Sequence, residues 1–151
     1  MSGCRPGRAG SLGPLLKAFL DPAPRLDLGS LLARRKFASA MIDVSDGLAV
    51  DLAHICEESR VGAEVDLCRI PLSRALRRFS KDPLPLALNG GEDFELLFTA
   101  RPGVVPRLLR LSRTSKITAI GRITPGEGIV AVDAAGRKKP LEIRGYEHFK
   151  S

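Results

Sequence analysis

The 151-residue sequence predicts a two-layer α/β or α+β sandwich built on a mixed sheet. Its length is that of one ordinary domain. Apolar residues make up 44% and charged residues 27% of the chain, which is a globular balance and excludes a wholly disordered or collagen-like protein. Strand patterns and helix patterns also alternate along the chain, an order typical of a sheet covered by helices.

The N-terminal part is expected to be irregular before the first helix. Residues 1–13 are rich in Gly, Arg and Ser and lack the apolar stretch of a secretory signal, so we expect a flexible lead-in. A short helix is expected over residues 14–20, ending before a pair of prolines. Another is expected over residues 30–36, with Ser30 as its N-cap. We therefore place the folded domain at residues 14–151.

A strand expected over residues 39–44 runs directly into an amphipathic helix over residues 47–59. At about 100° per residue, the apolar side chains of this helix form one arc. Cys56 lies on that arc and is expected in the core. Asp51 and His54 fall on the opposite side, where solvent is expected.

The middle of the chain continues the alternation. A strand is expected over residues 62–67 and a helix over 71–79, whose first residue is a proline, a favourable residue at that position. Residues 80–85 are polar and contain proline, which indicates a loop. A strand is expected over residues 93–99, with Phe94 on the same face as two other apolar side chains.

The C-terminal part predicts one more helix and three short strands. The helix is expected over residues 103–112. Strands are expected over 117–123 and 128–133, around a Pro-Gly turn, and a last strand near 137–143.

Lysine and arginine outnumber acidic residues by 24 to 17, which gives a formal net charge of +7. This charge favours anionic partners such as phosphates, nucleotides or nucleic acid. The alternative is a solvated basic surface, because many of these residues recur at helical spacing. Aromatic residues are only 5% of the chain, fewer than a nucleic-acid binder built on base stacking would need.

The cysteine pattern and the hydropathy indicate the cellular setting. Cys4, Cys56 and Cys68 show no CxxC spacing, which argues against a disulfide framework or a zinc site and fits a reducing cytoplasm. No apolar run approaches the about 20 residues needed to span a bilayer. We therefore expect a cytoplasmic protein without a membrane partner.

The segment Asp43-Val44-Ser45-Asp46-Gly47 lies where the first expected strand meets its helix. In an extended segment Asp43 and Ser45 point to the same side, toward the space that the first N–H groups of the helix face. Two carboxylates with Mg²⁺ would bind a phosphate there, because Mg²⁺ is often shared between one or two Asp and substrate phosphates. The residues alone leave another reading open, in which Ser45 or Asp46 is an N-cap and Gly47 a turn residue.

Two further segments are candidates for ligand contacts. Asn89-Gly90-Gly91-Glu92-Asp93 combines two glycines, which permit close backbone approach, with two acids, so it is either a substrate-recognition turn or a plain connection to the next strand. In the tail, Tyr146 would either stack on a flat heterocycle or pin the C-terminus to the core. The chain contains no GxxxxGK[ST] loop and no GxGxxG segment, so P-loop and Rossmann nucleotide binding are unsupported.

Four segments together resemble one family. They are MIDVSDGLAVDLAHICEESRVGAEVDLCRIPLS, ALNGGEDFELLFTA, IGRIT and GYEHF, in this order. They resemble the C-terminal domain of thiamine-monophosphate kinase, in the aminoimidazole ribonucleotide synthetase-related superfamily. The resemblance covers about residues 14–149.

The resemblance implies an ATP-dependent phosphotransferase that converts thiamine phosphate to thiamine diphosphate with several Mg²⁺ ions. Carried over by position, Asp43 and Asp46 resemble Mg²⁺ ligands, and Ser45 resembles an ATP contact. Glu92 resembles a substrate contact and Tyr146 the aromatic residue against the thiamine moiety. No side-chain nucleophile is implied, so the catalytic residues stay unassigned.

The sequence also departs from the family pattern. Family members are about twice as long, and their N-terminal domain supplies most metal ligands, much of the ATP site and the homodimer interface. We therefore expect a fragment, a truncated gene or a split subunit that needs a separate N-terminal domain. Smaller departures are Arg60, where the family usually has Gly, Phe94, where Tyr is common, and a shorter stretch between Ser73 and Ala87.

Three functional hypotheses follow. The first is half of a thiamine-monophosphate kinase, folded but inactive alone. The second is a non-catalytic domain that kept the fold and binds a nucleotide or a partner. The third, a nucleic-acid-binding module, is favoured only by the basic charge and is opposed by the acidic segments, so we expect no nucleic-acid partner.

Overall fold

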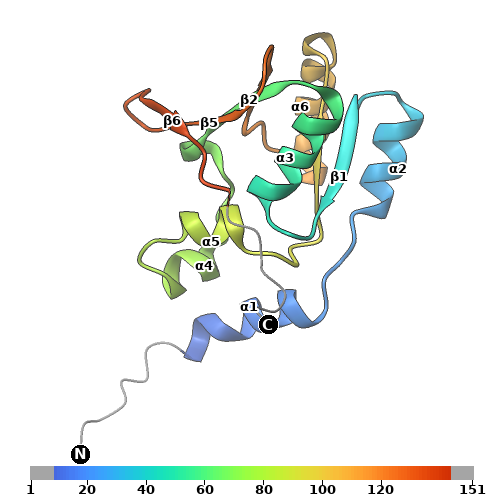
Figure 1. Ribbon diagram of the computed structural model, residues 1–151. Helices are drawn as coiled ribbons and strands as arrows, with labels where there is room; N and C mark the ends of the chain where they lie inside the picture. Colours follow the sequence, from blue (N-terminus) through green and yellow to red (C-terminus); the bar gives the residue numbers. More distant parts are fainter. Residues whose placement is uncertain (1–8, 144–151) are drawn as a thin grey trace, which may run out of the picture.

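A computed structural model of the chain describes residues 9–143, and Figure 1 shows how its elements are arranged. The α-helices in this range are α1 (Ala9–Leu20), α2 (Leu26–Arg34), α3 (Leu48–Ser59), α4 (Arg74–Phe79), α5 (Leu84–Asn89) and α6 (Val105–Ser115). The strands are β1 (Ala40–Val44), β2 (Gly62–Asp66), β3 (Glu95–Thr99), β4 (Gly121–Thr124), β5 (Ile129–Val132) and β6 (Lys138–Pro140). Two short 3₁₀ turns, η1 (Leu67–Arg69) and η2 (Pro102–Val104), complete the order.

The strands form two sheets. β1 pairs antiparallel with β3, and the other sheet has the order β4-β2-β5-β6. Within the latter, β2 and β5 are parallel and the other pairs are antiparallel, so the mixed sheet that the sequence predicts is confirmed. The segregation of β1 and β3 into a separate sheet is a feature that the strand order alone does not reveal.

Helix α3 lies between the two sheets and organises the core (Figure 1). Its residues Leu52, Ile55 and Cys56 are buried in one cluster with Val44 of β1 and Val65 of β2. The predicted apolar arc of this helix, including buried Cys56, is therefore confirmed. Because α3 follows β1 with a turn of only a few residues, its packing fixes the turn that carries the acidic segment.

The two N-terminal helices differ from the predicted boundaries. Helix α1 begins at Ala9 and continues past Pro14, so residues 9–13 are helical rather than a lead-in. Helix α2 begins at Leu26, which places Ser30 inside the helix, so its predicted N-cap role is wrong. The earlier start fits the acidic Asp27, since a carboxylate in the first turn complements the helix dipole.

The region between β2 and β3 holds the helix that the sequence analysis missed. Helix α4 begins after Ser73, whose hydroxyl accepts a hydrogen bond from the Leu76 N–H at 3.0 Å, rather than at the proline. Helix α5 occupies part of the predicted 80–85 loop and the residues after it. Its prolines lie at the first turn, where they are tolerated, and burial of Leu88 anchors it to the core.

The C-terminal elements follow the predicted order with shifted ends. β3 begins at Glu95 rather than residue 93, and β4 at Gly121 rather than 117. β5 and β6 lie inside their predicted ranges. Within residues 9–143, no helix is long and apolar enough to cross a bilayer.

Candidate functional site

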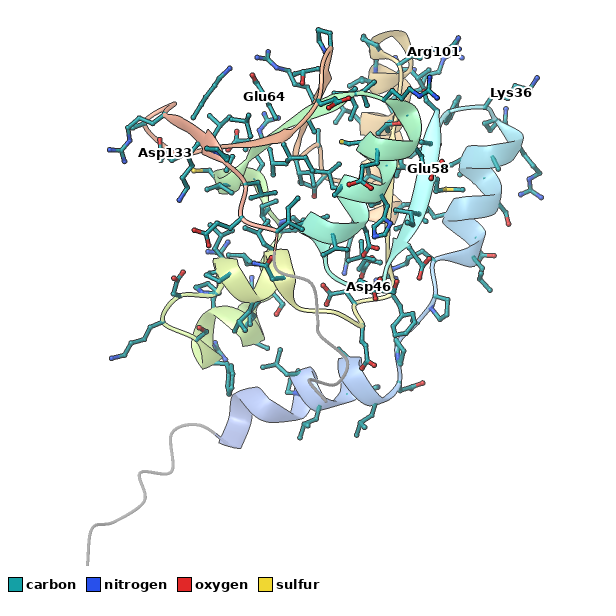
Figure 2. The ribbon with its side chains drawn as sticks, in the orientation of Figure 1. Lys36, Asp46, Glu58, Glu64, Arg101 and Asp133 are labelled. Carbon is teal, nitrogen blue, oxygen red and sulfur yellow. The ribbon has the colours of Figure 1, made fainter. Side chains whose placement is uncertain are left out.

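The candidate site is built around the turn from β1 to α3, residues 43–47, which we call the acidic corner. Asp43, near the end of β1, and Asp46, in the turn, are exposed, while Ser45 is half-buried. Figure 2 shows Asp46 at this turn, at the end of β1 where α3 begins. The alternation that the sequence predicts is confirmed, because Val44 points into the core and Asp43 does not.

Gly47 occupies the N-cap position of α3 and makes no side-chain cap hydrogen bond. The reading in which Ser45 or Asp46 caps the helix is therefore wrong. Gly47 has a φ of 119°, and a Cβ added there would lie 3.2 Å from the backbone carbon atoms of Asn89. Glycine is required at this position both by the backbone conformation and by the close approach of the Asn89 backbone.

Asp51 is the residue whose environment differs most from its prediction. It was expected in solvent, but it is only 2% exposed. Its Oδ2 accepts hydrogen bonds from the Ser45 N–H at 3.0 Å and the Asp46 N–H at 3.2 Å. The helical periodicity failed here because the first turn of α3 faces the acidic corner, whose backbone N–H groups recruit a carboxylate. The available signal was an acid one turn inside a helix that follows a glycine N-cap.

The Asn89–Asp93 segment crosses the acidic corner. The Glu92 N–H donates to the Ser45 carbonyl at 2.7 Å, and the Phe94 N–H donates to the Val44 carbonyl at 2.9 Å. A Cβ added to Gly91 would lie 2.6 Å from the Ser45 carbonyl oxygen, so only glycine permits this approach. The two segments that sequence analysis singled out separately thus form one structure.

The backbone is strained at residues 92–94, where the segment ends, and we call these residues the strained turn. Glu92 has a φ of 64° and Phe94 a φ of 49°, both in the left-handed region. Such conformations in non-glycine residues cost on the order of 1 kcal/mol or more each and gather at functional sites. The predicted placement of Phe94 on a strand face is therefore wrong, because this residue precedes β3 in the strained turn.

A pocket of about 350 Å³ adjoins the segment and is lined by Leu15, Leu16, Ala18, Phe79, Gly91, Glu92 and Asp93. Its walls come from α1, from the end of α4 and from the strained turn. Partial desolvation raises the pKa of the Asp93 carboxyl, and the charge of Glu95 adds to this effect. Apolar walls beside two carboxylates suit a ligand with an apolar body and a cationic or hydrogen-bonding part.

The acidic corner suits a shared metal ion better than a closed metal site. Within the described part of the chain, no group of three His, Cys, Asp or Glu side chains could hold a metal ion. The ion pairs formed between described residues do not involve Asp43 or Asp46. Two exposed carboxylates fit the usual coordination of Mg²⁺, which keeps several waters and binds one or two carboxylates plus phosphate oxygens.

The other candidate residues are distributed as follows. His54 is exposed on α3, as predicted for the polar side of this helix, and Cys68 is exposed in η1. Burial raises the pKa of the Cys56 thiol. Tyr146 lies outside the described residues. The basic residues of α2 and α4, and Arg107 and Arg110 of α6, are exposed on separate helices, as a solvated surface predicts.

With this geometry in place, comparisons with known proteins identify the family. The model of the family "AIR synthase related protein, C-terminal domain" matches residues 11–136. The chain belongs to this family. The match covers every described strand except β6 and every described segment of the site.

Relatives similar to this chain in sequence include thiamine-monophosphate kinases. The enzyme of Buchnera aphidicola subsp. Acyrthosiphon pisum is 39% identical over 139 residues, which cover 89% of this chain and 42% of the relative. The crystal structure of thiamine-monophosphate kinase from Stenotrophomonas maltophilia superimposes with a TM-score of 0.75 at 41% identity, over 82% of this chain and 40% of that one. A structure of AaThiL complexed with AMPPCP and TMP gives a TM-score of 0.74 at 31% identity, over 99% and 44% of the two chains.

These comparisons confirm the resemblance inferred from the four sequence segments. The chain is homologous to the kinases over one domain of the AIR synthase related family and spans about two fifths of the length of the relatives it matches.

Proposed function

We propose that this chain is the C-terminal part of a thiamine-monophosphate kinase. It would bind ATP with Mg²⁺ at the acidic corner and thiamine phosphate beside Glu92. The reaction would transfer the γ-phosphoryl group of ATP to the phosphate of thiamine phosphate, giving ADP and thiamine diphosphate. The similarity to kinases, and the AMPPCP and TMP in the AaThiL complex, support this assignment.

The observation that carries the proposal is the hydrogen bond from the Glu92 N–H to the Ser45 carbonyl, at 2.7 Å. It joins the segment proposed for the nucleotide to the segment proposed for the substrate. Phosphoryl transfer needs its two reactants held in line, and an in-line arrangement needs their binding segments in a fixed relation.

Each residue then has a proposed role. Asp43 and Asp46 would hold Mg²⁺, which when bound neutralises phosphate charge. Ser45 would contact ATP, while Glu92 and Tyr146 would bind thiamine phosphate. The attacking group is an oxygen of the substrate phosphate, so the chain needs to supply position and charge balance rather than a nucleophile.

The chain alone is proposed to be inactive. Asp43 and Asp46 supply only part of the ligand set that Mg²⁺ requires, and the remaining ligands would come from an N-terminal domain or subunit. In the assembled enzyme the family's homodimer is the expected state. The free cysteines Cys56 and Cys68 are consistent with a cytoplasmic setting.

Calorimetric titration of the chain with Mg·ATP and with thiamine phosphate tests the proposal, with and without a supplied N-terminal domain of a related kinase. We expect weak binding by the chain alone and thiamine diphosphate formation only after the domain is added. Asp43→Asn and Asp46→Asn should each weaken Mg·ATP binding at least tenfold, while Asp82→Asn, an exposed acid outside the site, should not. Robust turnover by the isolated chain would contradict the proposed incompleteness.

A second candidate is a non-catalytic domain that binds a nucleotide or a partner protein. It is favoured by the lack of a three-ligand metal cluster among the described residues. The same titration separates the two, because this candidate predicts binding but no thiamine diphosphate when the N-terminal domain is supplied. A reading frame for such a domain immediately upstream in the genome would favour the kinase.

A further inference from the structure

Asp51 has no role in the proposed reaction, yet it is the one buried charged side chain among the described residues. It is 2% exposed, and its carboxylate contacts the backbone of the acidic corner from the buried side. Burying a carboxylate is unfavourable unless hydrogen bonds compensate it. Here the compensation comes from two backbone N–H groups, those of Ser45 and Asp46.

The Ser45 residue is held on both of its backbone polar groups. Its N–H donates to Asp51 at 3.0 Å, and its carbonyl accepts from the Glu92 N–H at 2.7 Å. A continuous chain of hydrogen bonds therefore runs from the first turn of α3 through the Ser45 backbone to the strained turn. Asp51 is not among the residues proposed to bind either ligand, but both ligand segments are hydrogen-bonded to the backbone that it holds.

We propose that Asp51 is a positioning residue that holds the backbone of Ser45 and Asp46 and, through the Ser45 carbonyl, holds Glu92 in its strained conformation. As far as ligands are concerned, this inference rests on the proposed function. As a statement about the backbone, it stands on the hydrogen bonds alone.

The strain at Glu92 is the reason that the anchor matters. A left-handed conformation at a non-glycine residue persists only when its surroundings determine it. Glu92 is determined by the Ser45 carbonyl, and its neighbour Phe94 by the Val44 carbonyl. Without the Asp51 carboxylate, the Ser45 and Asp46 N–H groups lose their acceptor, the Ser45 peptide is free to turn, and Glu92 relaxes.

The chain offers a matched control in Asp133. Its Oδ1 accepts from the Ala135 N–H and the Arg137 N–H, both at 2.9 Å, in the turn between β5 and β6. The backbone part of the pattern is the same, one carboxylate oxygen on two backbone N–H groups, and in Asp133 the other oxygen also accepts from Arg137 Nε at 2.7 Å. Figure 2 shows Asp133 well apart from Asp46 and the acidic corner.

Amide hydrogen exchange measured by NMR on the full chain tests the backbone relay. In Asp51→Ala we expect the amides of Ser45, Asp46 and Glu92 to exchange at least tenfold faster, while amides of β2 and β5 change less than twofold. In Asp51→Asn, whose amide oxygen can still accept, we expect a smaller acceleration, a partial rescue. In Asp133→Ala only the amides of Ala135 and Arg137 should accelerate.

Two outcomes would overturn the relay. One is an unchanged Glu92 amide in the Asp51 variants, and the other is an acceleration equal to that of the β5 amides, which would mean general destabilisation. If Asp51→Ala does not fold, Asp51→Asn decides alone, with an acceleration of at least threefold at Glu92 expected.

Ligand titration supplies the functional arm, at a temperature at which every variant is folded. Asp51→Asn should bind Mg·ATP and thiamine phosphate about tenfold more weakly than the wild type, and Asp133→Asn should match the wild type. Equal affinities of the wild type and Asp51→Asn for both ligands would overturn the positioning role. If the wild type binds neither ligand even with the N-terminal domain of a related kinase supplied, the proposed function is wrong, and amide exchange still decides the part of Asp51 in the fold.

Discussion

The four-stranded sheet and the acidic corner differ in whether their acidic side chains form ion pairs. On the sheet, Glu64 of β2 is paired with Arg122 of β4 and with Lys138 of β6, so three strands are joined by neutralised charges. At the corner, Asp43 and Asp46 are exposed and take part in none of the ion pairs formed between described residues. Figure 2 shows Glu64 on this sheet and Asp46 at the distant turn.

The backbone repeats this contrast. The strands around Glu64 pair in regular register, whereas the turn across the corner contains two non-glycine residues with positive φ. Backbone strain lowers stability and gathers at functional sites, so a region that keeps it is a candidate for binding or catalysis. The contrast separates the part of the domain that holds the fold from the part that is free to hold a ligand.

Glycine substitutions should give the largest effects and distinguish the two regions. Gly91→Ala places a methyl group 2.6 Å from the Ser45 carbonyl oxygen, and Gly121→Ala places one against the Glu64 carbonyl. Both should lower the free energy of unfolding by about 1–3 kcal/mol, as overpacking does. Only Gly91→Ala should also weaken Mg·ATP binding, measured by calorimetry at a temperature at which both variants are folded.

Gly103→Ala is the control, since an added Cβ there meets no atom within 4 Å. Its unfolding free energy and its Mg·ATP affinity should match those of the wild type. Equal loss of binding in Gly91→Ala and Gly121→Ala would contradict the separation of the two regions.

Replacing strained residues by glycine should give effects of intermediate size. Arg60 ends α3 with a φ of 53°, a left-handed conformation that glycine adopts without strain. Arg60→Gly and Glu92→Gly should each raise the free energy of unfolding by about 1 kcal/mol, because each relieves a left-handed conformation. Thermal denaturation measures this gain.

The two stabilised variants should differ in their affinity for thiamine phosphate. Arg60→Gly should leave thiamine phosphate binding intact, whereas Glu92→Gly should lose it, because a proposed ligand contact is removed. If Glu92→Gly binds thiamine phosphate as tightly as the wild type, the proposed role of Glu92 as a substrate contact is wrong.

The pH dependence of stability should differ in sign between the regions, with the smallest effects. Hydrogen bonding from Lys138, opposed by desolvation and helped by Arg122, holds the pKa of Glu64 below its usual range. A lowered pKa stabilises the fold above the unfolded-state pKa, and the contribution is lost as the pH falls through the folded-state pKa. Glu64→Gln should therefore be less stable than the wild type at pH 7, and the difference should vanish in acid.

Asp93 should behave in the opposite way, because its pKa is raised by desolvation and by Glu95. A raised pKa favours the fold only below the unfolded-state pKa, and ionisation at higher pH works against it. Asp93→Asn should be more stable than the wild type at pH 7, by less than about 1 kcal/mol because solvent still screens this partly exposed group. Melting temperatures followed from pH 7 down to pH 3 check both signs, and curves that move together would contradict the contrast.

The sequence predicted the parts of this molecule that depend on local periodicity. The apolar arc of α3 placed Cys56 in the core, and the alternation in β1 placed Asp43 outside it. It could not reveal the burial of Asp51, because the acceptor that the corner needs is set by the path of the turn and not by the helical period. Helix α5 was missed for a related reason, because prolines in a short segment predict a loop. Only the burial of Leu88 in the folded chain shows that this segment packs as a helix against the core.

The site was predicted as separate pieces rather than as one structure. Spacing and residue type pointed to Ser45 and to Glu92, but the hydrogen bond between their backbones joins segments distant in sequence. The glycine pair indicated close approach without showing what is approached. Only the three-dimensional path of the chain supplies the Ser45 carbonyl as the partner of Gly91.

The parallel pairing of β2 with β5 has a consequence during synthesis. Ala63 meets Ile129 in that ladder, so β2 finds its partner only when most of the domain has left the ribosome. Until then α3 lacks the sheet on one of its sides, and the nascent chain exposes Leu52 and Ile55. The turn between β1 and α3 therefore gains its rigid support only late in synthesis.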